Sequence, residues 1–127
     1  MTLSSVSPLP AATRVVIVDD HPMVAEGIEA LLESYDDIQV LATLSDGRQI
    51  IDQLDTLGPD LILMDLSMPV LGGLEATRLI RQFENETKKS ACRIVALTAN
   101  AQPSDVEACL SVGMDDFLSK PFRKSDL

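Results

Sequence analysis

Side chains able to do phosphoryl chemistry follow four apolar runs of the sequence. Asp19 and Asp20 come directly after "VVIV", and Asp65 comes directly after "LILM". Thr98 and Lys120 end two later runs, "CRIVALT" and "DFLSK". If these runs are parallel strands of one sheet, their carboxyl ends meet at one edge of it. Three carboxylates, a hydroxyl and an ammonium would then gather at that edge.

Three neighbouring carboxylates repel one another, and a hard divalent cation removes that cost. Mg²⁺ takes oxygen ligands, keeps several waters and is often bound together with a phosphate. We expect Asp20 and Asp65 to bind Mg²⁺ directly and Asp19 to bind it through a water. The backbone carbonyl of Ser67 is a further expected ligand.

A carboxylate beside a metal and a lysine can attack a phosphoryl group and become an aspartyl phosphate. Asp65 is the best candidate nucleophile, because it stands at the end of the central apolar run and faces the acidic pair. Lys120 would neutralise charge on the phosphoryl oxygens. Thr98 would donate a hydrogen bond to one of those oxygens.

Other reactive residue types are expected to be structural. The pair Asp36-Asp37 falls in a turn. The pair Asp115-Asp116 falls at the amino end of its run, away from the chemistry. We expect His21 to begin a helix and not to bind Mg²⁺, which prefers oxygen. Cys92 and Cys109 lie in apolar contexts and are expected to be buried, reduced thiols.

The elements that must position these groups alternate regularly. Apolar residues recur at helical spacing between five runs rich in β-formers. This order predicts an α/β fold, a doubly wound parallel sheet with helices on both faces. The predicted strands are residues 14–18, 38–44, 60–64, 92–98 and 116–120.

Local signals mark where two of the helices begin and end. Asp46 with Gln49 forms a capping box, and Gly58 ends the helix that follows. Ser104 with Glu107 forms a second such box, and Val106, Cys109 and Leu110 form the buried stripe of that helix. Gly113 is expected to end it.

Composition limits the class of protein. The 127 residues suit one domain, which we place at 14–127 after a flexible leader over 1–13. The domain reads as truncated at the start of a fifth helix, since only "RKSDL" is left for it. The net charge of −10 argues against binding nucleic acid. No signal peptide or membrane span is evident, so a cytoplasmic protein is expected.

Four motifs, "VDD", "ILMDLSMP", "ALTA" and "LSKPF", resemble in their order the receiver domain of two-component response regulators. The resemblance covers residues 14–122 and implies a flavodoxin-like five-stranded sheet in the order 2-1-3-4-5. "MPVLGG" departs from the family, because Gly72 stands where Asp or Asn is usual. The resemblance also implies roles for single residues. Asp19 and Asp20 would be the metal pair, Asp65 the phosphoacceptor, and Thr98 and Phe117 the switch. Lys120 would be the lysine typical of the family, and Lys120-Pro121 would be a cis peptide.

In such a domain a sensor histidine kinase or a histidine phosphotransfer protein would phosphorylate Asp65, and the change would switch a protein-interaction surface. The resemblance also implies dimer formation on phosphorylation. It implies Mg²⁺ as the cofactor and no enzymatic turnover beyond slow autodephosphorylation. The output module is left open, because the first half of the chain resembles DNA-binding response regulators. The second half resembles receivers attached to hybrid histidine kinases.

Two other classes of protein fit the sequence less well. A Mg²⁺-dependent phosphohydrolase of the haloacid-dehalogenase type would carry a second Asp two residues after the nucleophile, and here that residue is Ser67. A flavodoxin-like module that only binds flavin would need a phosphate-binding loop and stacking aromatics. The chain has no Trp and one Tyr.

Overall fold

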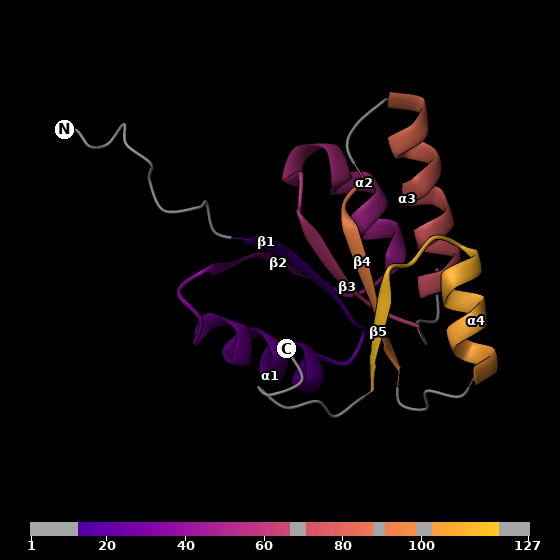
Figure 1. Cartoon of the computed structure of the whole chain (residues 1–127). Coiled ribbons are helices and arrows are strands. Elements are labelled where there is room, and N and C mark those ends of the chain that lie inside the picture. The colour runs from indigo at the N-terminus through magenta and orange to yellow at the C-terminus, as the bar shows by residue number, and fades with distance from the viewer. Residues whose placement is uncertain (1–12, 67–70, 88–90, 99–102, 120–127) are drawn as a thin grey trace.

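The computed structural model describes residues 13–66, 71–87, 91–98 and 103–119 (Figure 1). Strands and helices alternate along these ranges, as predicted. The strands are β1 Thr13–Val18, β2 Ile38–Leu44, β3 Leu61–Asp65, β4 Arg93–Thr98 and β5 Asp116–Ser119. The helices are α1 Pro22–Glu33, α2 Gly47–Leu57, α3 Gly73–Thr87 and α4 Pro103–Ser111.

The strands form one parallel sheet in the order β2-β1-β3-β4-β5. This is the order that the flavodoxin-like prediction requires. The order reverses between β1 and β3, which are neighbours in the sheet although β2 lies between them in sequence. A ligand crevice forms beyond the carboxyl ends of the strands at such a reversal. The acidic residues after β1 and β3 both stand there.

The pairing of β1 with β2 contains one irregularity. Val15 pairs with Val40, but Val16 pairs with Ala42, so the register shifts by one residue of β2. Pairing then continues to Val18 and Leu44, and the Asp19 amide donates to the Leu44 carbonyl at 2.9 Å. The backbone of Asp19 is therefore held by β2 although its side chain belongs to the crevice.

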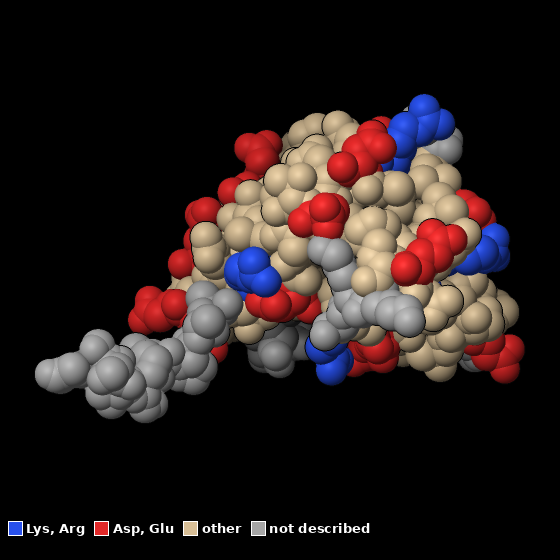
Figure 2. Space-filling model, turned by 90° about the horizontal axis from the view of Figure 1, so that it is seen from above, with Lys and Arg blue, Asp and Glu red and all other residues tan. Residues whose placement is uncertain are grey.

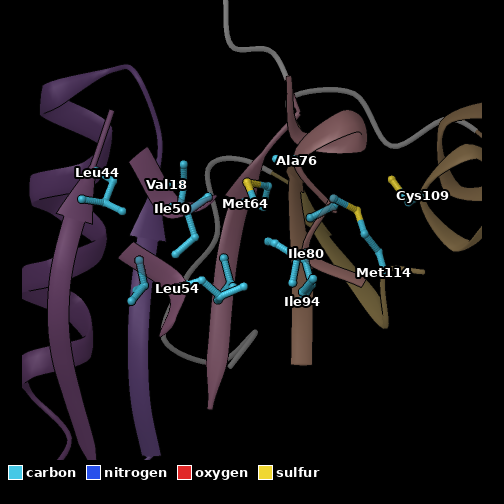
Figure 3. Close-up of a cluster of buried hydrophobic side chains, with 13 residues drawn as sticks. Val18, Leu44, Ile50, Leu54, Met64, Ala76, Ile80, Ile94, Cys109 and Met114 are labelled. Atoms are coloured by element: carbon cyan, nitrogen blue, oxygen red, sulfur yellow. The ribbon is translucent and has the colours of Figure 1, made fainter. Parts of the chain in front are cut away.

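The core is divided by the sheet into two layers. Figure 3 shows the larger one, in which side chains of α2, α3 and α4 pack on one face. Val18 and Met64 of the strands meet Ile50, Ile80 and Cys109 of those helices there. α1 covers the other face with three buried side chains, Ala25, Ile28 and Leu32. Because both faces of β1 and β3 are covered, these strands are nearly continuous apolar runs.

The predicted signals of α2 are confirmed. The Asp46 side chain accepts hydrogen bonds from the backbone of Arg48 and Gln49, and the Gln49 side chain completes the capping box. Gly58 ends the helix in the left-handed conformation, at a φ of 53°. At the start of α2, the capping box thus satisfies the backbone N–H groups of Asp46, Arg48 and Gln49.

Two predictions for α4 are wrong. Ser104 is not the N-cap, because the helix already includes Pro103, a residue favoured in the first helical turn. Leu110 does not belong to the buried stripe, since 55% of it is exposed, whereas Cys109 is buried. The end of the helix is as predicted. Gly113 has a φ of 104°, and two backbone bonds, Gly113 to Leu110 and Met114 to Cys109, form a Schellman motif.

A polar cluster ties α3 to the amino ends of β4 and β5, and the sequence did not reveal it. The Arg81 guanidinium donates to the Gly113 and Cys92 carbonyls, at 2.9 and 2.8 Å. It also pairs with Glu84 at 2.8 Å and with Asp115 at 3.0 Å. The two carboxylates in turn accept from the backbone N–H groups of Cys92 and Ile94. Glu84 is 8% exposed, so the ion pair of Arg81 with Glu84 is largely removed from water. Hydrogen bonds to backbone groups satisfy both members of this pair.

The cluster changes the ionisation of its members. Burial opposes the charge of Arg81, but the hydrogen bond to Glu84 and the other nearby acidic groups raise the pKa of the guanidinium above its ordinary value. Burial, together with Glu84, raises the pKa of the Cys92 thiol to about 12. Burial also raises the pKa of Cys109. Both thiols are unpaired in the structure, as expected for reduced cysteines, though Cys92 is only partly buried.

Acidic side chains are spread over the surface seen in Figure 2, and basic ones are fewer. Among the described residues, no helix combines the length and apolar character needed to cross a membrane. The predicted leader lies outside the described residues apart from Thr13, which is the first residue of β1.

Candidate metal and phosphoacceptor site

The crevice brings together the three carboxylates that the sequence singled out. β1 and β3 pair in parallel up to Val18 and Met64, so Asp19 and Asp65 follow at the same level of the sheet. Both are buried, each 2% exposed. Asp20 is half-buried and keeps access to solvent. The predicted meeting of these carboxylates at one edge is thereby confirmed.

His21 also lies in this cluster, which the sequence did not indicate. Its Nδ1 atom is 3.0 Å from Asp19 Oδ1, 3.0 Å from Asp20 Oδ1 and 3.8 Å from Asp65 Oδ2. One ligand atom from each of the four residues lies within 4.8 Å of all the others. Four donor atoms at such separations can surround a single cation.

The turn after β1 sets these positions. Asp19 Oδ1 accepts from the His21 backbone N–H at 2.9 Å and lies 3.0 Å from Nδ1 of the His21 ring, which donates to it in the tautomer protonated at Nδ1. His21 is the N-cap of α1, as predicted, but its side chain does not cap the helix. The ring is directed to the carboxylates by the turn that joins β1 to α1.

One buried oxygen supports a cation at this position. Asp20 Oδ1 is buried and accepts no hydrogen bond from the described residues. His21 Nδ1 lies at ion-pair distance from it but without hydrogen-bond geometry. A buried carboxylate oxygen with no donor is unfavourable, and a divalent cation would satisfy it. The set of oxygen donors fits Mg²⁺.

The fourth and fifth strands place the predicted switch residues near this edge. Thr98 is the last residue of β4, and its neighbour Leu97 pairs with Asp65. Thr98 is 9% exposed. Phe117 in β5 pairs with Ala96 and packs against the larger core layer. The positions match those predicted, while the roles of both residues as a switch stay a prediction.

Three predicted site residues lie outside the described ranges. They are Ser67, expected to offer its carbonyl to the metal, and Lys120 with Pro121, expected to bind phosphoryl oxygens and to form the cis peptide. Their assignments remain those made from the sequence.

The start of α3 approaches the phosphoacceptor closely. A Cβ atom on Gly73 would lie 2.4 Å from the carbonyl oxygen of Asp65 and 3.0 Å from Met64 Cγ. The Asp65 oxygen belongs to the backbone, so it cannot rotate away as a flexible side chain could. Glycine is therefore required by space at Gly73, directly after the departure from the family pattern at Gly72.

A hollow of about 310 Å³ opens beside the cluster, between the start of α1 and the end of β2. Its lining includes four carboxylate residues, Asp19, Asp20, Glu26 and Glu29. The approach to the crevice from this side therefore carries a negative charge that favours cations.

Comparison with known proteins agrees with this geometry. The sequence matches the response regulator receiver domain family over residues 15–127. The chain belongs to this family. It is 36% identical over 113 residues to the nitrate/nitrite response regulator protein NarL of Escherichia coli, an alignment covering 89% of this chain and 50% of that protein. The chain thus spans about half the length of that relative.

Solved receiver domains share its fold. One belongs to a sensor histidine kinase of Pseudomonas aeruginosa and holds a magnesium ion in its active-site cleft. It is 40% identical, with a TM-score of 0.77 and 91% of each chain covered. Another is the receiver domain of Ssk1 from Saccharomyces cerevisiae, solved in complex with the histidine phosphotransfer protein Ypd1. It is 28% identical, with a TM-score of 0.84, and the match covers 94% of this chain and 86% of that one.

Proposed function

We propose that this receiver domain accepts a phosphoryl group on Asp65 from a phosphohistidine of a sensor kinase or of a histidine phosphotransfer protein. The single observation that carries the proposal is the cluster itself, in which Asp65 lies buried at the crevice beside Asp19 and Asp20. The magnesium ion in the relative from Pseudomonas aeruginosa and the partner of the Ssk1 receiver support it.

In the proposed reaction, an oxygen of the Asp65 carboxylate attacks phosphorus, and the bond from phosphorus to the imidazole nitrogen breaks. The imidazole leaves with the electron pair, and Asp65 becomes an acyl phosphate. When bound, Mg²⁺ would supply charge neutralisation for the phosphoryl oxygens. Asp20 and Asp65 would hold it directly, Asp19 through a water, and the Ser67 carbonyl would complete the protein ligands.

Two further groups act on the phosphoryl oxygens. Lys120 would neutralise their charge, and Thr98 would donate a hydrogen bond to one of them. Thr98 ends β4, so a shift of its hydroxyl toward the phosphate is transmitted to the end of that strand and to its neighbour β5. Phe117 would follow, and the surface formed by α4 and β5 would change. The output is then a change in protein binding, with no turnover of a substrate.

Phosphorylation from a small donor tests the proposal. Incubation of the chain with acetyl phosphate and Mg²⁺ should add one phosphoryl group to its intact mass. Asp65→Asn should abolish the addition, because the amide is not a nucleophile. Asp36→Asn removes an exposed carboxylate from a turn far from the crevice, so it should be phosphorylated like the natural chain. Addition that persists in Asp65→Asn, or that needs no Mg²⁺, would overturn the proposal.

A further inference from the structure

We propose that the His21 imidazole is a metal ligand at this site, so that the crevice binds borderline transition-metal cations such as Ni²⁺ and Zn²⁺ through mixed nitrogen and oxygen donors. The inference rests on the cation site of the proposed function. It goes beyond it by adding a nitrogen ligand and a second class of metal. His21 is the only histidine of the chain.

The distances suit shared coordination. Two neighbouring ligands of an octahedral cation with bonds of about 2.1 Å lie about 3.0 Å apart. His21 Nδ1 is 3.0 Å from Asp19 Oδ1 and 3.0 Å from Asp20 Oδ1. A hydrogen bond explains only the first of these separations, since Asp20 Oδ1 accepts none. A cation bound by Nδ1 and by Asp20 Oδ1 would explain the second separation, with the ring proton on Nε2 and Asp19 still bound through a water.

The ring is held where it can act as a ligand. The backbone N–H of His21 donates to the same Asp19 oxygen that the ring contacts, so the turn fixes the ring against the carboxylates. The ring does not cap α1, so metal binding costs the helix no hydrogen bond. The His21 side chain is 58% exposed, which lets hydrated cations reach it and exchange.

The donor atoms determine which cations bind more tightly when His21 is a ligand. Imidazole nitrogen suits Ni²⁺, Cu²⁺ and Zn²⁺, whereas Mg²⁺ takes oxygen and keeps its waters. His21 should therefore strengthen the binding of Ni²⁺ and Zn²⁺ and leave that of Mg²⁺ nearly unchanged. A receiver domain with this residue would discriminate less strongly in favour of Mg²⁺.

Calorimetric titration of the untagged chain with Ni²⁺ and with Mg²⁺ tests this. Both titrations are done in the same buffer at about pH 8, because metal affinity depends on pH. Asparagine is a favoured N-cap residue, so His21→Asn keeps the start of α1 while removing the imidazole. Ni²⁺ affinity should fall on the order of tenfold or more, and Mg²⁺ affinity should stay within about threefold. Glu26→Gln, which removes a charge from the same hollow, should affect both metals equally.

A direct readout accompanies the titration. In the chain labelled with ¹⁵N-histidine, Zn²⁺ should shift the Nδ1 resonance of His21, and Mg²⁺ should not. Unchanged Ni²⁺ affinity in His21→Asn, or an Nδ1 resonance that Zn²⁺ leaves in place, would overturn the nitrogen ligand while Mg²⁺ binding still upholds the proposed function. If Asp20→Ala binds both metals as tightly as the natural chain, the cation site of the proposed function fails as well.

Discussion

Neighbouring carboxylates after β1 are held in different ways. Asp19 is buried, and its Oδ1 accepts a hydrogen bond from the His21 backbone N–H and lies 3.0 Å from the ring Nδ1. Asp20 keeps 24% of its side chain exposed, and its buried Oδ1 accepts no hydrogen bond from the described residues. A cation can bind Asp20 without breaking a hydrogen bond, but at Asp19 Oδ1 it must compete with one. This supports the assignment of Asp20 as the direct ligand.

Alanine substitution of Asp19 and of Asp20 should show which carboxylate contributes more to Mg²⁺ affinity. Asp20→Ala is expected to weaken Mg²⁺ binding on the order of tenfold or more, and at least as much as Asp19→Ala, because a direct ligand is lost. Calorimetric titration with Mg²⁺ measures both affinities, and circular dichroism checks that each variant is folded. A larger loss in Asp19→Ala, with its fold intact, would reverse the assignment.

At the residue scale, much of the site could be predicted from types and strand ends. Asp19, Asp20 and Asp65 follow apolar runs, and the parallel order alone brings them together. The ring of His21 could not be placed, because its direction depends on the turn geometry after β1. Asp115 precedes β5 at the amino end of the strand, away from the crevice, as the sequence predicts. Its bonds to Arg81 and Ile94 depend on packing between elements distant in sequence.

Among the elements, the contact between the start of α3 and the end of β3 is the tightest constraint on the site. Gly73 has no room for a side chain against the Asp65 carbonyl oxygen. Any larger residue must move either the helix or the phosphoacceptor. The position of α3 and the geometry of the crevice are thus linked through a single backbone contact.

Gly73→Ala should lower the free energy of unfolding by about 1–3 kcal/mol, the usual cost of forcing atoms into a packed site. It should also weaken Mg²⁺ binding, because Asp65 is displaced. Gly27→Ala is the matched control. Gly27 lies inside α1 with nothing within 4 Å of an added Cβ, so alanine there should raise stability by about 0.5–1 kcal/mol. Urea unfolding followed by circular dichroism measures both. Equal effects of the two substitutions would contradict the packing argument.

Element boundaries were predictable where the signal is local. The capping box at Asp46 and the glycines Gly58 and Gly113 act within a few residues, and all three were found in the sequence. The irregular register of β1 with β2 was not, because it depends on how two strands meet. Leu110 matched the helical stripe, yet it is exposed. The described part of the fold offers no element to cover it, and a periodicity cannot reveal that.

For the whole molecule, charge is the dominant global property. The chain carries 20 acidic and 10 basic residues, a net charge of −10. Like charges oppose compaction, and salt screens them over a Debye length of about 8–10 Å at physiological ionic strength. The crevice adds to this repulsion, because it concentrates carboxylates in a partly buried place.

Stability should therefore respond to salt in two separable ways. Raising NaCl from low to physiological ionic strength should increase the free energy of unfolding on the order of 1 kcal/mol, through screening. At matched ionic strength, Mg²⁺ at one hundred times its Kd should add about 2.7 kcal/mol through specific binding. At the same Mg²⁺ concentration, a tenfold loss of affinity in Asp20→Ala should reduce the second effect to about 1.4 kcal/mol or less and leave the first in place. Circular dichroism suits the measurement, since the chain has no Trp. Equal stabilisation by the two salts would argue against a specific site.

Arg81 holds the amino ends of β4 and β5 against α3. Its guanidinium connects α3, the amino end of β4 and the turn before β5, away from the crevice. It stays charged at any pH at which the protein is folded. A conformational change at one end of the sheet is well defined only if the other end of the sheet stays in place. Because the amino ends of β4 and β5 are tied in this way, the proposed movement of Thr98 and Phe117 would be confined to the carboxyl ends of these strands.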